Sequence, residues 1–220
     1  MILYIYIYIR VCFIISFFLK NKIKYTTKIL CEFKYWIYSN THRLCEISVV
    51  HEGKLLLLVL LVSETENCIG YIVTRKLLEK EKTLTKTTDE NGWSPLHYAA
   101  YNVRSTRVLQ VLLEYDASAA YIAETEKKRT ALHIAAIRGR VNAMKEIVSR
   151  CPACCELVDN RGWNALHYAV ASKDTKAFEE CLKIPELGRL RTEKDDKGNT
   201  PFHLIAALAH EQKEWRFVFF

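Results

Sequence analysis

A pattern of apolar and polar positions recurs four times through the C-terminal two thirds of this chain. Each copy opens with a short phrase in which a leucine or phenylalanine precedes a histidine: SPLHYAA at 94–100, TALHIAA at 130–136, NALHYAV at 164–170 and TPFHLIA at 200–206. Successive histidines are 36, 34 and 36 residues apart. Because no single unit of this length can bury its own apolar face, the period is typical of a stacked solenoid.

Within each copy the pattern predicts a hairpin tip and two helices. Segments rich in acidic residues and glycine, at 89–92, 159–162 and 195–198, indicate tight turns. The next residue but one is a good helix N-cap in each copy, and proline follows it twice: Ser94-Pro95, Thr130, Asn164 and Thr200-Pro201. Apolar residues at helical spacing then predict a second helix at 108–113, 144–148 and 178–182. Lys128 replaces the tip glycine of the second copy, so this turn is expected to widen or to be strained.

The same register sets the expected boundaries of the folded region. A second-helix pattern at 76–79 lies one period before the first complete copy, so residues 68–87 are predicted to be the latter half of a partial repeat. Residues 88–210 are predicted to hold about four repeats, the last incomplete, and 211–220 an irregular tail. The predicted fold class is all-α: a solenoid of helix-turn-helix units joined by β-hairpin loops.

Residues 1–67 form an apolar, low-complexity N-terminal segment without this period. Its first 19 residues are long enough and apolar enough to span a bilayer. Four lysines follow within residues 20–28, so a signal anchor at 1–19 would leave the repeats in the cytoplasm. The alternating Tyr and Ile codons equally fit a mispredicted gene start, and both interpretations stay open.

Charge argues against nucleic acid as a partner. The chain carries a net charge of +7, but residues 87–220 hold 19 Lys and Arg against 18 Asp and Glu, whereas residues 1–86 hold 13 against 7. The repeat region is therefore nearly neutral overall and has no charge excess from which to build a phosphate-binding stripe.

The repeats resemble ankyrin repeats in their hairpin tip, their Thr-Pro-Leu-His-like helix start and their second helix. Over residues 70–207, and above all in CPACCELVDNRGWNALH and DDKGNTPFHL, the chain is similar to the plant membrane ankyrin proteins of the accelerated-cell-death and increased-salt-tolerance type. In that family a Pro-Gly-Gly-containing domain with several transmembrane helices follows the array. This sequence ends before such a domain.

The resemblance implies a protein–protein interaction scaffold. It also implies signalling in stress or defence responses at the cytoplasmic face of the plasma membrane, with the cytoplasm as the alternative location. A second hypothesis is that the chain is a truncated, non-functional fragment of a membrane ankyrin protein.

The recurring histidines favour a structural role over catalysis. A catalytic histidine is expected once, beside a nucleophile or carboxylate, whereas these four occupy one place at each helix start. They are predicted to bridge backbone groups of adjacent turns: His97, His133, His167 and His203. Phosphate-binding glycine loops and nucleophile elbows are also lacking, so the chain is predicted to be neither an enzyme nor a cofactor carrier.

One cysteine cluster offers a third hypothesis. Cys151, Cys154 and Cys155 form a C-x-x-C pair plus one, but no nearby motif supplies a fourth ligand for zinc. The cysteines are therefore expected to pack in a loop without metal, and a metal or redox sensor is kept as the alternative. The chain has eight cysteines and no glycosylation sequon, which is typical of a reduced, intracellular protein.

Partner-binding positions follow from the register. The slot directly after each tip holds Trp93, Arg129, Trp163 and Asn199, and a helix position that the pattern usually leaves polar holds Tyr101 and Ile137. Aromatic anchors on an exposed edge contribute about 2 kcal/mol or more each to binding when a partner buries them. The alternative is that the two indoles pack on neighbouring hairpins.

Overall fold

The computed structural model of this chain describes residues 69–102 and 106–211. The predictions for residues 1–67, including the anchor at 1–19, and for the tail from 212 to 220 lie outside these residues. Within the described part, none of the helices combines the length and apolar character that crossing a bilayer requires.

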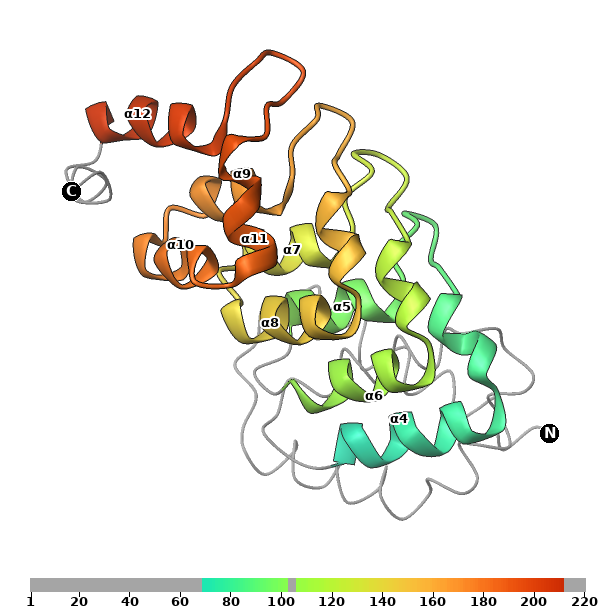
Figure 1. The fold of residues 1–220 in the computed structure, drawn as a ribbon. Coiled ribbons are helices and arrows are strands. Elements are labelled where there is room, and N and C mark those ends of the chain that lie inside the picture. The colour runs from blue at the N-terminus through green and yellow to red at the C-terminus, as the bar shows by residue number, and fades with distance from the viewer. Residues whose placement is uncertain (1–68, 103–105, 212–220) are drawn as a thin grey trace, which may run out of the picture. The chain divides into compact units, whose positions relative to one another are not determined.

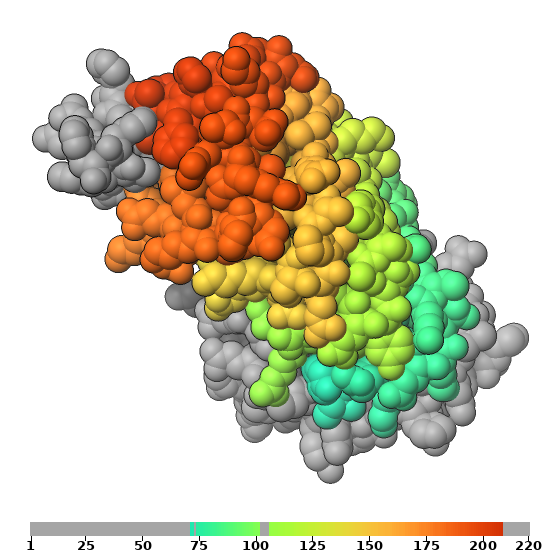
Figure 2. Space-filling model, in the orientation of Figure 1, coloured from blue at the N-terminus to red at the C-terminus, as the bar shows by residue number. Residues whose placement is uncertain are grey.

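The described helices form two parallel rows (Figure 1). The inner row consists of α5 (Pro95–Asn102), α7 (Ala131–Ile137), α9 (Ala165–Ala171) and α12 (Pro201–Glu211). The outer row consists of α4 (Ile69–Lys80), α6 (Arg107–Tyr115), α8 (Val141–Arg150) and α10 (Thr175–Leu182). Each helix packs on the next one of its own row, so consecutive repeats appear as successive bands in the space-filling view (Figure 2). The predicted all-α class is confirmed.

Small residues let the inner helices approach one another. The paired alanines Ala99-Ala100 and Ala135-Ala136 are at most 1% exposed, and so are Leu96, Leu132 and Leu166 of the repeated phrase. In the fourth copy the equivalent Phe202 is only half-buried. The core therefore runs between the rows and thins at the fourth repeat.

Outer helices supply the larger apolar groups and a charged outer surface. Val111 and Leu112 of α6, Ile147 of α8 and Phe178 of α10 are at most 1% exposed, as the helical spacing predicts. Exposed ion pairs link neighbouring outer helices, including Arg75 to Glu114, Arg150 to Glu114 and Lys145 to Glu180. Such pairs contribute little to stability individually, so apolar burial is what holds the rows together.

A short 3-10 helix follows each outer helix: η1 (Lys82–Lys86), η2 (Ala117–Tyr121), η3 (Pro152–Glu156) and η4 (Arg189–Thr192). The third repeat inserts one more helical turn, α11 (Pro185–Gly188), before η4. Helix α11 was not predicted from the sequence, although Pro185 at its first position is a helix-start signal.

Both ends of the described region are helical. Helix α4 contains the predicted 76–79 segment and packs on α6 as an outer helix. Helix α12 includes Glu211, so the predicted irregular tail is wrong at that residue. Leu208 and the alanines around it have high helix propensity, which favours continuation of the helix.

Candidate functional site

Hairpin loops project from one side of the stack and form a continuous edge (Figure 1). An aspartate at the start of each of three tips organises the loop. One carboxylate oxygen of Asp89 accepts hydrogen bonds from the backbone N–H of Asn91 (2.9 Å) and Trp93 (2.8 Å). Asp159 and Asp195 repeat this arrangement with the N–H groups two and four residues later. These bonds fix the backbone of the slot residues that were predicted to bind a partner.

In two tips the second carboxylate oxygen of the aspartate accepts a hydrogen bond from a tyrosine hydroxyl. Tyr98 and Tyr168 donate to Asp89 and Asp159, each at 2.7 Å. Burial and these bonds raise the pKa of both tyrosines to about 12, so the hydroxyls stay protonated donors. Burial also opposes ionisation of Asp159, but the hydrogen bonds that it accepts from Tyr168, Trp163 and Arg161 outweigh burial and lower its pKa.

In the second tip a glutamate, Glu124, organises the loop in place of an aspartate. Glu124 stands six residues before the capping Thr130, whereas the aspartates of the other tips stand five residues before theirs. Its longer side chain is 98% buried and accepts from Glu126 N, Lys127 N and Arg129 Nε at 2.8 to 3.0 Å. Lys128 adopts a positive φ of 59°, so this turn is both widened and strained, and both expectations are met.

Backbone hydrogen bonds join each tip to the next. The N–H of Thr125 donates to Asn91 O (3.0 Å), that of Asn160 to Lys127 O (3.0 Å) and that of Asp196 to Arg161 O (3.1 Å). The only bridge of β type in the described residues is an isolated pair, Ala123 with Thr130. A ladder of single bonds along the tips, without regular strands, therefore sets the spacing of the edge.

Two of the repeated histidines, His97 and His167, bridge neighbouring repeats. Nδ1 of His97 accepts from the backbone N–H of Ser94, and its Nε2 lies 3.1 Å from the carbonyl oxygen of Arg129 in the next hairpin. His167 makes the same pair of contacts with Asn164 and with the carbonyl of Asn199. Each ring thus caps its own helix and holds the following slot residue.

His133 and His203 depart from this arrangement. His133 caps Thr130 but its Nε2 makes no hydrogen bond, and Tyr168 packs edge-on against its ring at 5.5 Å. Burial lowers the pKa of His133 to about 4, so the ring is neutral at pH 7. His203 caps Thr200 and is exposed.

Two of the six predicted partner-binding residues lie together. The rings of Trp93 and Tyr101 meet edge to face with centroids 5.8 Å apart, and the guanidinium of Arg138 lies 4.5 Å above the Tyr101 ring. Tyr101 is 38% exposed and Arg138 is also exposed. We call Trp93, Tyr101 and Arg138 the ridge. Arg138 was not predicted from the sequence, because its contact with Tyr101 crosses from one repeat to the next.

The other four predicted residues are engaged within the stack. Trp163 donates from Nε1 to Asp195 (3.0 Å) and is covered by the guanidinium of Arg161 at 4.1 Å. Arg129 pairs with the buried Glu124, Asn199 donates to Asp195, and Ile137 is half-buried. Trp163, Arg129 and Asn199 therefore already have partners within the stack.

The cysteines of the third hypothesis lie in and beside η3. Cys151, Cys154 and Cys155 are 6%, 0% and 0% exposed, and all are free thiols. Among residues 69–102 and 106–211, no group of three or more histidine, cysteine or acidic side chains has an arrangement that could hold a metal ion.

Comparison with known proteins supports one family. Residues 91–122 match the family model described as ankyrin repeat, and residues 118–184 match the model described as ankyrin repeats in three copies. Neither model describes a catalytic domain.

Similar proteins share parts of this region. The chain is 28% identical over 137 residues, 60% of its length and 30% of the relative's, to the target of rapamycin complex 2 subunit AVO2 of Saccharomyces cerevisiae. It is 43% identical over 68 residues to human ankyrin repeat and SOCS box protein 3, covering 30% of this chain and 13% of that protein. A third match, 27% identical over 73 residues, covers 33% of this chain and 6% of delta-latroinsectotoxin-Lt1a of Latrodectus tredecimguttatus.

The chain thus spans less than a third of each of these relatives. The family matches cover residues 91–184, and the paired helices and linked hairpin tips of the described part form an all-α solenoid consistent with ankyrin repeats.

Proposed function

We propose that this chain is a protein-binding scaffold and that its partner contacts the ridge formed by Trp93, Tyr101 and Arg138. The observation that carries the proposal is the exposed Tyr101 ring, held between an indole and a guanidinium. Tyrosine, tryptophan and arginine are the residue types that most often dominate protein–protein binding energy.

The ridge is packed at its base and exposed on its outer side. Trp93 packs against Tyr98 and His97 at its base, which leaves Tyr101 and Arg138 as the outer, exposed members. A preorganised aromatic surface loses little conformational entropy when a partner covers it. Trp163 differs, because Asp195 already takes its N–H and Arg161 covers its ring.

A comparative pull-down tests the proposal. The full chain is used as bait beside Tyr101→Ala with Arg138→Ala, and beside Lys145→Ala with Lys183→Ala on the exposed outer helices as the control pair. Proteins whose capture depends on the ridge should be lost with the first pair and kept with the second. For one such protein in purified form, calorimetry should show affinity reduced about 30-fold, which corresponds to about 2 kcal/mol. Equal capture by all three baits, with unchanged melting, would exclude the ridge.

A finer proposal concerns where the scaffold acts. The similarity of residues 70–207 to the plant membrane ankyrin proteins supports a role in stress or defence signalling at the cytoplasmic face of the plasma membrane, with residues 1–19 as the attachment. Fractionation of a full chain tagged at its C-terminus, with an intact N-terminus verified by sequencing, tests the attachment. Recovery only in the soluble fraction would leave the cytoplasm as the location.

A further inference from the structure

The turns between inner and outer helices carry a row of cations. Arg138 and Arg140 lie at the turn from α7 to α8, and Lys173 and Lys176 lie at the turn from α9 to α10. We call these four residues the basic edge. The sequence of the two turns contains one carboxylate, that of Asp174, so four cations stand against one anion. The edge is therefore positive, although the repeat region as a whole is nearly neutral.

The basic edge is continuous with the ridge. The guanidinium of Arg138 lies 4.5 Å from the centre of the Tyr101 ring, which joins the first repeat to the second turn. A Cβ atom on Gly139 would lie 3.3 Å from Oδ2 of Asp174, so the turns of the second and third repeats are closely packed. Gly139 and Lys173 hold the same place in these turns, with φ values of 61° and 62°. One surface thus extends from Tyr101 over two consecutive turns.

Ion pairs do not neutralise the basic edge. In the part of the chain that the structure describes, none of its four cations forms an ion pair, and the buried Nε of Arg140 makes no hydrogen bond. Oδ1 of Asp174 accepts the N–H of Ala177 and caps α10. By contrast, Arg75 and Arg150 of the outer helices both pair with a glutamate.

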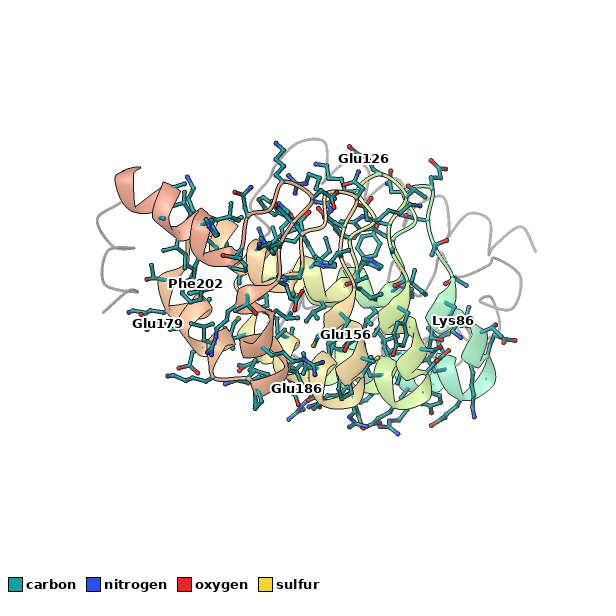
Figure 3. All side chains as sticks on the ribbon, turned by 45° about the horizontal axis from the view of Figure 1, so that its top comes forward. Lys86, Glu126, Glu156, Glu179, Glu186 and Phe202 are labelled. Atoms are coloured by element: carbon teal, nitrogen blue, oxygen red, sulfur yellow. The ribbon has the colours of Figure 1, made fainter. Side chains whose placement is uncertain are left out.

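Other carboxylates lie away from the basic edge. Figure 3 shows Glu126 at a hairpin tip and Glu156 and Glu186 on the side below the tips. The 3-10 helix that contains Glu156 follows the C-terminus of α8, whereas the edge lies at its N-terminus, so about 15 Å of helix separates them. This distance exceeds the Debye length of about 8 Å at physiological ionic strength. On α10, Glu179 follows Lys176 by three residues, but no ion pair joins these two described side chains.

We propose that the basic edge binds an acidic segment of the partner protein, with an apolar side chain of that segment on Tyr101. This inference rests on the proposed binding function, because Arg138 belongs to both surfaces. Packed helices lie about 8 to 10 Å apart, which sets the distance between the two turns. In a polyproline II segment, residues three apart lie on one side and about 9 Å from each other. Carboxylates three residues apart therefore match Arg138 and Lys173.

A protein segment suits this surface better than a nucleic acid does. Nucleic acids require cations that follow the phosphate backbone, whereas the basic edge covers two turns and includes Asp174. The exposed Tyr101 ring offers apolar area that a peptide side chain can cover.

Selection from a library of short random peptides displayed on phage tests the proposal. The immobilised full chain is the bait, and enriched peptides are synthesised with a fluorescein label for polarisation measurements. We expect enriched peptides to contain pairs of Asp or Glu three residues apart, with an apolar residue beside them. Their affinity should fall as the salt concentration is raised from about 50 to about 200 mM, because exposed charges are screened.

Charge reversal at two exposed lysines tests the edge separately from the ridge. Lys173→Glu with Lys176→Glu should weaken binding of the enriched peptides about 10-fold or more. The control pair Lys82→Glu with Lys194→Glu, which is equally exposed, should change it by about twofold at most. Glutamate is favoured near a helix N-terminus, so the first pair should leave the melting midpoint unchanged. If it does melt early, Lys173→Ala with Lys176→Ala replaces it and should also weaken binding.

Dependence on Tyr101 distinguishes this proposal from the one on which it rests. Peptides that lose affinity for Tyr101→Ala but bind the charge-reversed chain unchanged would overturn the acidic segment and keep the ridge. Peptides that depend on the lysines but not on Tyr101 would keep the edge and count against the ridge. A selection that enriches no acidic peptide would overturn the inference. Tighter binding of duplex DNA or of phosphatidylserine vesicles through the same lysines would overturn it too.

Discussion

His167 and Asn199 join the third repeat to the fourth through one hydrogen bond, in which the ring Nε2 lies 3.1 Å from the backbone carbonyl oxygen. The imidazole is fully buried and its Nδ1 simultaneously caps α9 at Asn164. One side chain therefore fixes both the start of a helix and the position of the following hairpin. The equivalent ring in the fourth repeat, His203, caps its helix but is exposed.

This difference predicts unequal costs for the same substitution. His167→Ala removes a buried bridge and opens a cavity, so it should lower the free energy of unfolding by about 2 to 3 kcal/mol. His203→Ala removes only an exposed cap and should cost about 1 kcal/mol or less. Urea denaturation of the two full-chain variants measures both values. Equal losses would contradict the bridging role of His167.

Two tip glycines predict a measurable effect of hairpin stacking. Gly162 and Gly198 both adopt a positive φ, 75° and 81°, so alanine is strained at either position. A Cβ at Gly162 would lie 2.8 Å from the backbone nitrogen of Asp196, whereas a Cβ at Gly198 would meet nothing within 4 Å. Gly198→Ala should therefore cost about 1 to 2 kcal/mol, and Gly162→Ala at least about 1 kcal/mol more. Denaturation midpoints in the reverse order would show that the fourth hairpin does not rest on the third.

The strained lysine in the second tip predicts a stabilising substitution. Lys128 occupies the slot of the tip glycines with φ 59°. Lys128→Gly should raise the free energy of unfolding by about 0.5 to 1 kcal/mol, because relief of strain exceeds the added entropy of the unfolded chain. Lys127→Gly is the matched control, since Lys127 does not have a positive φ, and it should destabilise. A stabilisation by both variants, or by neither, would mean that backbone strain is not the cause.

Sequence reasoning found the helix pairs because their signals are local. Capping residues such as Thr130 and Asn164, and apolar residues at helical spacing, act within one repeat and can be read from one repeat. The insertion of α11 was missed because Pro185 lies three residues after the end of the outer helix α10, where proline is also a stop signal.

The site was predicted less completely, because its contacts cross repeats. Trp93 and Trp163 occupy the same slot, yet only Trp163 meets an aspartate of the following hairpin. The corresponding residue in the hairpin after Trp93 is Glu124, whose carboxylate forms an ion pair with Arg129. A one-residue insertion in the second tip thus changes what the preceding indole contacts, and spacing alone does not reveal it. The contact between Arg138 and Tyr101 was not predicted either, because it joins two consecutive repeats.

Acid should destabilise the stack in a defined pH range. Burial lowers the pKa of His97 and His167, and lowers that of His133 to about 4, from an ordinary value of 6.5. Between pH 6.5 and about 4 the unfolded chain binds protons that the folded chain does not, so stability is complete above pH 6.5 and falls as the pH decreases. Below about pH 4, protonation of Asp159 and Asp195, whose folded pKa values are lowered, adds a further loss.

Removing the His133 titration tests that prediction at one residue. His133→Gln keeps a polar side chain of similar size but cannot gain a proton. The free energy of unfolding that is lost between pH 6.5 and 4 should therefore be smaller by an amount on the order of 3 kcal/mol. Melting midpoints of the full chain at half-unit steps of pH measure the slope. His203→Gln is the control, because that ring is exposed, and its profile should follow the wild type. Identical slopes for His133→Gln and the wild type would show that the imidazolium of His133 is accommodated in the folded stack, against its full burial and against the absence of any hydrogen bond at its Nε2.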